Sequence, residues 1–181
     1  MSRIAIPGRD DAPAESQPIL DNINKMLGFV PNHYRLMSIS PNVLGGWAGL
    51  MGSLSKALDL KTREGIALAV SEANGCDYCL AAHSYVSTNL AKIPPEEIDL
   101  NRQGRSSDSK RQAAVAFAKA LIETRGKLSD AQFAAVKDAG WTDASTLEMI
   151  ALTAQFLLTN FVNNAVRTPI DFPEVRPAKA V

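Results

Sequence analysis

One stretch limits what this chain can fold into more than any other. It is a pair of helices separated by an Asn-Gly stop, with both cysteines of the protein directly after that stop. Residues 63–73 have apolar side chains at helical spacing, and Asn74-Gly75 then ends the helix, because Gly adopts the left-handed conformation with least strain. A second helix is expected to open at Cys76 or Asp77 and to continue to about residue 89. The sequence thus predicts a helix–turn–helix with the thiols at the turn.

The spacing of the reactive side chains places them on one face of the second helix. Cys76 and Cys79 are three residues apart, and His83 follows Cys79 by four. The helix N-terminus favours a thiolate at Cys76, whereas the imidazole one turn away favours a thiolate at Cys79. The spacing also allows a local disulfide to close and reopen. The residues alone therefore leave open which cysteine reacts first.

The run from Glu64 to His83 resembles the core signature of the alkylhydroperoxidase D (AhpD)-like family, within the carboxymuconolactone decarboxylase superfamily. That signature is a Glu, eleven residues, and then Cys-x-x-Cys-x-x-x-His, and it is matched by Glu64, Cys76, Cys79 and His83. The flanks, from about residue 19 to 165, are similar to the peroxidase-related members. The resemblance implies an all-α, AhpD-like helical bundle.

The resemblance also implies an activity, a thiol-dependent alkyl hydroperoxide reductase or disulfide oxidoreductase. Cys79 would attack the peroxide, Cys76 would resolve the resulting sulfenic acid, and His83 with Glu64 would relay the proton. The electron donor would be a thiol protein or a dihydrolipoyl group, with no metal, haem or flavin. One departure is Tyr78, which stands where the best-studied kind of member has a second His between the cysteines, so the relay is expected to be simpler and peroxidase activity weaker or differently directed.

Other interpretations of these residues compete with the redox site. A structural zinc ion normally needs four Cys or His ligands, and the only remaining histidine, His33, is remote in sequence. His33 lacks a nearby acidic partner and is expected at the surface or partly packed. Buried, inert cysteines are common. Glu72, on the same helix as Glu64, is the rival carboxylate.

Two further functions compete with peroxide reduction. Relatives in the superfamily that lack cysteines decarboxylate lactones by proton transfer without a cofactor, which would leave the Cys76–Cys79 pair without a role. The other alternative is a redox-responsive oligomeric protein that is not an enzyme, in which the state of the two thiols alters assembly.

Length and composition limit the class of protein. The 181 residues suit one domain, with an extended arm over 1–17, a helical domain over 18–167 and a loose Pro-rich tail over 168–181. The 19 basic and 19 acidic residues cancel, so no nucleic-acid partner is expected. There is no uninterrupted apolar run of about 18 residues and no signal-like hydrophobic core near the N-terminus. We therefore expect a cytoplasmic protein that is not in a membrane, where a two-cysteine motif is more often catalytic than structural.

Two helices outside the motif bear on the site and on assembly. The helix expected from residue 41 to about 58 contains Trp47, Leu50 and Met51, which are expected in the core or as a wall of a substrate pocket. The helix from 143 to about 166 is apolar over most of its circumference. Part of that surface is expected to be buried by another subunit, in a homo-oligomer that the resemblance suggests is a trimer or a multiple of one.

The two halves of the chain show a short internal similarity. The residues from Glu64 to Leu68 resemble those from Glu148 to Leu152, which would pair Cys76, Cys79 and His83 with three polar residues that lack their reactivity. These counterparts are Asn160, Asn163 and Arg167. The alternative is that the two helices are unrelated and that the asparagines are polar groups satisfied near a helix end.

Overall fold

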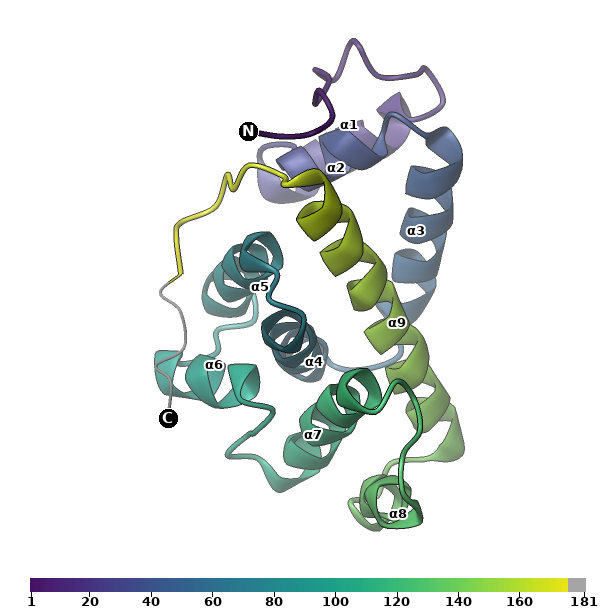
Figure 1. The fold of residues 1–181 in the computed structure, drawn as a ribbon, viewed down its shortest axis with the longest axis vertical. Helices are drawn as coiled ribbons and strands as arrows, with labels where there is room; N and C mark the ends of the chain where they lie inside the picture. The colour runs from purple at the N-terminus through teal and green to yellow at the C-terminus, as the bar shows by residue number, and fades with distance from the viewer. Residues whose placement is uncertain (176–181) are drawn as a thin grey trace.

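A computed structural model describes residues 1–175 of the chain, and these residues form helices without any strand. The predicted all-α class is confirmed (Figure 1). The helices are α1 (Gln17–Leu27), α2 (Asn32–Met37), α3 (Pro41–Leu54), α4 (Leu60–Ala73), α5 (Asp77–Asn89), α6 (Pro95–Arg102), α7 (Ser109–Glu123), α8 (Asp130–Asp138) and α9 (Asp143–Val166).

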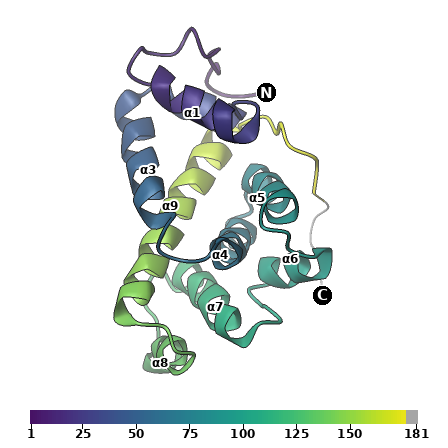
Figure 2. The same ribbon diagram turned by 180° about the vertical axis from the view of Figure 1, so that it is seen from behind.

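Helix α4 is the centre of the bundle. It contacts α5, α6, α7 and α9, and Figures 1 and 2 show it between them from both sides. Its residues 64–71 are all buried, which agrees with an apolar helix packed on every side. Asp59 is the N-cap of this helix, and its carboxylate accepts from the Thr62 N–H at 3.0 Å. The first half of the motif is therefore fixed in the core.

A close contact at Gly65 holds α4 against α6 and α7. A Cβ atom at this position would lie 2.7 Å from Asn101 Oδ1 and 3.0 Å from Val115 Cγ2. Only a residue without a side chain permits this separation between the helices. Because Glu64 is the neighbouring residue, this packing also sets the position of its carboxylate.

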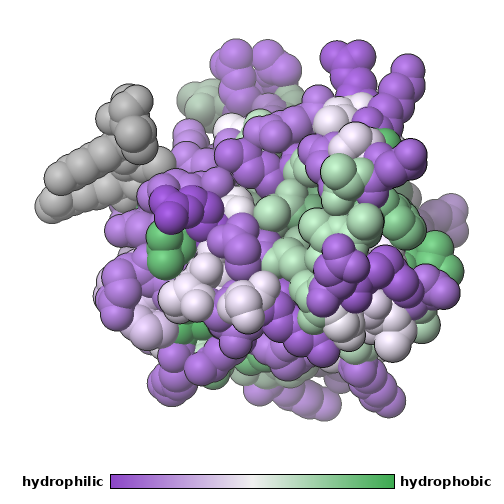
Figure 3. Space-filling view, turned by 90° about the horizontal axis from the view of Figure 1, so that it is seen from below, coloured by the Kyte–Doolittle hydropathy of each residue, from purple (hydrophilic) through white to green (hydrophobic). Residues whose placement is uncertain are grey.

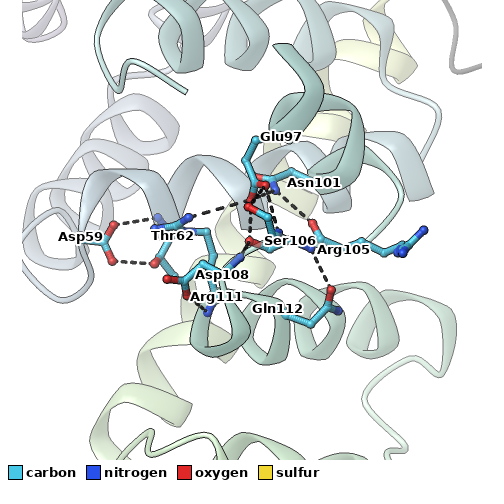
Figure 4. Close-up of polar contacts among 10 residues, drawn as sticks. Asp59, Thr62, Glu97, Asn101, Arg105, Ser106, Asp108, Arg111 and Gln112 are labelled. Carbon is cyan, nitrogen blue, oxygen red and sulfur yellow. Dashed lines mark hydrogen bonds and ion pairs between the residues drawn. The ribbon is translucent and has the colours of Figure 1, made fainter. Parts of the chain in front are cut away.

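A polar network fastens the segment between α6 and α7 (Figure 4). The buried carboxylate of Glu97 accepts hydrogen bonds from the hydroxyls of Ser106 (2.5 Å) and Ser107 (2.6 Å) and from Asn101 Nδ2 (3.0 Å). Burial by itself would raise the pKa of Glu97, but these donors outweigh it and lower the pKa to about 2. The network thus depends on an ionised carboxylate.

Helix α9 runs beside α3 and across α4, α5 and α7. Among the described helices it is the one whose length and hydropathy would suffice to cross a membrane, although the central helix of a globular bundle has the same character. The face toward the bundle also contains buried polar residues, namely Gln155, Thr159, Asn160 and Asn163.

The suggested internal repeat is not reproduced as a second helix–turn–helix. Helix α9 continues without a break through Asn160 and Asn163, whereas the first half turns at Gly75, which has φ +57°. No glycine lies within α9 to allow such a turn.

The segments before α1 and after α9 both contact the body of the protein within the described residues. The N-terminal segment is attached to the end of α9 through Arg3, whose backbone N–H donates to Val166 O at 2.8 Å. In the segment after α9, the Asp171 carboxylate accepts from the Asn32 N–H at 2.7 Å. The expectation of a loose tail is therefore wrong for residues 168–172, which contact the body of the protein, and residues 176–181 of the tail lie outside the described residues.

Candidate active site

The turn between α4 and α5 brings the two sulfurs together. After the left-handed Gly75, the Cys76 N–H bonds back to Ser71 O at 2.9 Å. Cys76 is the N-cap of α5, and its Sγ accepts from the Cys79 N–H at 3.4 Å. The cap turns the first thiol back over the helix toward the second.

Both cysteines are free thiols with their sulfurs 2.7 Å apart. Cys76 is fully buried and Cys79 is 3% exposed. Of the two cysteines, only Cys79 lines a cavity of about 350 Å³. A molecule in that cavity would therefore meet Cys79, with Cys76 behind it.

The pKa values of the two thiols move in opposite directions. The hydrogen bond from Cys76 lowers the pKa of Cys79 to about 7, against the effect of burial, and the nearby His83 and donors from Asn163 and Asn160 add to it. The pKa of Cys76 is raised well above its ordinary value by its bond to Cys79 and by burial. The sequence left the choice between the cysteines open, and this geometry favours a thiolate at Cys79.

Glu64 and His83 form a pair from two helices. Glu64 Oε2 lies 2.9 Å from His83 Nδ1. Burial opposes a charged imidazole, but the Glu64 carboxylate and the charge at Cys79 outweigh it, so the pKa of His83 is raised. The rival carboxylate, Glu72, is directed elsewhere and bonds to Arg102 Nε at 2.7 Å.

A third helix reaches the thiol through Asn163. Its Nδ2 donates to Cys79 Sγ at 3.3 Å, and its Oδ1 lies 3.3 Å from Nδ1 of His33. The expectation that His33 is a surface or partly packed residue is wrong, because it is only 6% exposed. Burial lowers the pKa of His33 to about 4, so its imidazole is neutral at physiological pH.

No pattern in the sequence places Asn163 and His33 at the site. They lie 84 and 46 residues from Cys79 along the chain, and no local spacing connects them to it. The available signal was the group of asparagines, including Asn160 and Asn163, inside the most apolar helix. Buried polar groups need partners, and here one partner is the thiol.

The cavity beside Cys79 has a volume of about 350 Å³. Two of the residues that line it, Met26 and Leu90, are exposed to solvent. Trp47 and Met51 line it as expected, but Leu50 does not and is 40% exposed. Ring side chains form much of the wall, contributed by His33, Tyr34, Trp47, Tyr78, His83, Phe156 and Phe172. Such a space suits a small organic molecule.

Tyr78, the residue between the cysteines, faces the C-terminal segment instead of the sulfurs. Its hydroxyl donates to Asp171 Oδ1 at 2.8 Å and accepts from the His33 N–H at 3.0 Å. Its ring packs edge-on against Phe172, with centroids 5.8 Å apart. Tyr78 therefore closes one side of the cavity and has no hydrogen bond to Cys79.

The arrangement contains no ligand set for a metal ion. Across residues 1–175, no three His, Cys, Asp or Glu side chains are grouped so that they could hold one. The arrangement suits thiol chemistry instead, with an ionisable sulfur at a cavity wall, a second sulfur behind it and a carboxylate–imidazole pair nearby.

Comparisons with known proteins give a family match over part of the chain and a fold shared with solved structures. Residues 41–123 match the model of the carboxymuconolactone decarboxylase family, while no curated protein matches significantly. An uncharacterized peroxidase-related protein from Ralstonia eutropha JMP134, described as an alkylhydroperoxidase AhpD core, superposes with a TM-score of 0.84 at 24% identity, over 94% of this chain and 92% of its own.

Two further solved structures have the same fold. A peroxidase-related protein from Silicibacter sp. TM1040 gives a TM-score of 0.80 at 22% identity, covering 93% of this chain and 91% of its own. A cysteine-to-alanine variant of the debrominase Bmp8, in complex with 2,3,4-tribromopyrrole, gives 0.80 at 23% identity over 94% of each chain. At these identities the similarity establishes a shared fold and leaves the reaction to be argued from the site.

Proposed function

Residues 41–123 match the carboxymuconolactone decarboxylase family and the fold is that of an AhpD core, and from these findings we propose that the chain is an AhpD-like member of that superfamily and reduces organic hydroperoxides with its two thiols. The observation that carries the proposal is that Cys79 alone of the pair lines the cavity, with its pKa lowered to about 7. A thiol of this kind is substantially ionised near neutral pH, and the thiolate is the reactive form.

The reaction can be written with the groups in place. The Cys79 thiolate attacks the terminal oxygen of ROOH, which breaks the O–O bond and leaves Cys79 as a sulfenic acid. The leaving alkoxide takes a proton from His83, whose charged form is stabilised by Glu64. Cys76, 2.7 Å away, then displaces water from the sulfenic acid to form the Cys76–Cys79 disulfide.

An external dithiol completes the cycle by reducing this disulfide. A thiol protein or a dihydrolipoyl group is the donor implied by the resemblance to the AhpD-like family. We place the protein in the cytoplasm, where such donors keep thiols reduced.

A donor-coupled turnover assay tests the proposal. Cumene hydroperoxide consumption is measured with dihydrolipoamide for the native protein and for Cys79→Ser and Cys76→Ser. We expect turnover only in the native protein, because Cys79→Ser cannot attack and Cys76→Ser cannot close the disulfide. Turnover that survives in Cys79→Ser contradicts the proposal.

Reductive debromination is a second candidate, favoured by the similarity to Bmp8 and by the ring-lined cavity. The same two thiols would supply two electrons: an aryl bromide and the dithiol give the arene, bromide, a proton and the disulfide. Bromide release from 2,3,4-tribromopyrrole under the same donor conditions tests it. If bromide is released faster than hydroperoxide is consumed, debromination is the main activity.

We also propose that the protein forms a homo-oligomer, a trimer or a multiple of one. Large apolar side chains on the outer face of α9 are exposed, with Leu147 at 66% and Phe161 at 59%. The space-filling view from below shows that hydrophobic residues gather in places among hydrophilic ones on this side of the molecule (Figure 3). Light scattering during gel filtration should give a multiple of the 19.4 kDa chain, and a monomer at micromolar concentration contradicts this.

A further inference from the structure

Three polar side chains around the cavity are buried without hydrogen-bond partners at one atom each. The atoms are Nε2 of His33, Nε1 of Trp47 and Oε1 of Gln155. The three residues are 6%, 7% and 2% exposed, and all three line the cavity beside Cys79. Buried polar groups in folded proteins nearly always have a partner, so three unpaired atoms around one cavity point to a ligand.

The three residues form one cluster, although they come from three helices. Gln155 Nε2, on α9, donates to the backbone oxygen of Trp47, on α3, at 3.4 Å. The rings of Trp47 and of His33, on α2, meet edge-on with centroids 5.6 Å apart. Trp47 therefore links the other two residues, Gln155 through its backbone oxygen and His33 through its ring.

The surroundings of each unpaired atom show whether it can donate or accept a hydrogen bond. Asn163 donates to Cys79 Sγ through Nδ2, so its Oδ1 is the atom that faces His33 Nδ1 and must accept. The proton of the neutral imidazole is thus on Nδ1, which leaves a lone pair on Nε2 of His33. Gln155 Oε1 is also an acceptor, whereas the indole N–H of Trp47 can only donate.

We propose that His33, Trp47 and Gln155 form a polar subsite that binds a neutral hydroxyl group of an organic substrate. A hydroxyl can donate to His33 Nε2 or Gln155 Oε1 and accept from the Trp47 N–H at the same time. An ionised carboxylate would bring a negative charge against two lone-pair acceptors and is excluded. The inference rests on the proposed function only in taking this cavity as the substrate site.

The subsite lies next to the reactive sulfur, because His33 and Cys79 share Asn163 as a hydrogen-bond partner. The rest of the cavity wall is mainly apolar, with residues such as Met51 and Phe156. A substrate held by its hydroxyl at one end would therefore place an apolar body along this wall. The substrate class is a hydroxyl-bearing organic molecule small enough for a cavity of about 350 Å³.

Binding of three matched ring compounds tests the subsite without any turnover. The probes are p-cresol, toluene and p-toluate, which differ only in having a hydroxyl, no polar group or a carboxylate. Dissociation constants are measured by ligand-observed NMR in Cys79→Ser, so that no thiol chemistry takes place. We expect p-cresol to bind about tenfold more tightly than toluene, the effect of one or two well-placed hydrogen bonds, and p-toluate to bind most weakly.

Variants made in the same background locate the preference. Gln155→Leu and Trp47→Phe should each reduce the preference for p-cresol over toluene to within about twofold. Met51→Leu, on the apolar part of the wall, should leave the ratio unchanged. If Trp47→Phe does not fold, as judged by circular dichroism, Gln155→Leu decides alone.

Four results overturn the subsite. In the first, p-cresol and toluene bind equally; in the second, p-toluate binds most tightly; and in the third, no probe binds. In the fourth, the preference for p-cresol over toluene is retained in folded Gln155→Leu and Trp47→Phe. None of them depends on peroxide reduction. Failure of the proposed function, seen as turnover in Cys79→Ser, can therefore be distinguished from failure of the subsite.

Discussion

The hydrogen bond from Asn163 to Cys79 gives the most quantitative prediction. Replacing Asn163 by Ala removes a donor that lies 3.3 Å from the sulfur and lowers the pKa of the thiol. A hydrogen bond to a charged group contributes about 1.5–3 kcal/mol, and one pH unit corresponds to about 1.4 kcal/mol. We therefore expect the pKa of Cys79 to rise from about 7 by roughly one to two pH units.

The thiolate population changes accordingly. Near pH 7 the native Cys79 is about half ionised, and in Asn163→Ala the ionised fraction should fall to about 1–10%. The rate of reaction falls less, because a thiolate with a higher pKa is a stronger nucleophile. The direct readout is therefore the ultraviolet absorbance of the thiolate as a function of pH. Cys76 does not interfere, because its pKa is raised well above the ordinary range.

A neighbouring residue supplies the matched control. Asn164 is also on α9, but its Nδ2 donates to the backbone oxygen of Asn74 at 3.1 Å and does not reach the sulfurs. Asn164→Ala should leave the thiolate titration unchanged. The reasoning is refuted if Asn163→Ala titrates like the native protein, or if both variants shift equally.

Three further predictions concern the proton relay, the core and the polar network. Glu64→Gln removes the charge that raises the pKa of His83. An NMR titration of the variant should therefore give an imidazole pKa below the value in the native protein. An unchanged imidazole pKa would contradict the pairing of Glu64 with His83. Gly65→Ala should lower the free energy of unfolding by about 1–3 kcal/mol, because its Cβ would collide with α6 and α7. The control Gly49→Ala, on α3, has open space around its Cβ and should be neutral or stabilising. Urea unfolding measures both variants. Because the pKa of Glu97 is lowered in the folded protein, its carboxylate contributes fully to the free energy of unfolding above the ordinary carboxyl pKa, and this contribution is lost as the pH falls toward 2. The free energy of unfolding of the native protein should therefore fall more steeply than that of Glu97→Gln between about pH 5 and pH 2. Parallel pH profiles of the two proteins would contradict this.

The parts of the site that were predictable from sequence are those set by local geometry. Helical spacing places Cys76, Cys79 and His83 together, and Gly75 marks the turn before them. The pairing of Glu64 with His83, across two helices, was expected only from the resemblance to a family. The helix boundaries followed from caps and apolar periodicity, which are also local, although α3 ends at Leu54, short of the expected residue 58.

The parts that could not be predicted depend on which helices become neighbours. Asn163 reaches the thiol because α9 crosses α5, and nothing in its local sequence specifies that crossing. His33 has no acidic partner nearby in the sequence, and in the fold its partner is the amide of Asn163, from a distant helix. The C-terminal segment was expected to be loose from its prolines, yet Asp171 and Phe172 find partners near the motif.

The most direct test of the account is to find which sulfur is oxidised first. Cys76→Ser is treated with one equivalent of cumene hydroperoxide in the presence of dimedone, which traps sulfenic acids, and the adduct is located by mass spectrometry. The matched variant Cys79→Ser is treated in the same way. We predict a stoichiometric adduct on Cys79 in the first protein and none in the second. An adduct on Cys76 in Cys79→Ser, with no adduct on Cys79 in Cys76→Ser, would contradict the assignment of Cys79 as the thiol that meets the substrate.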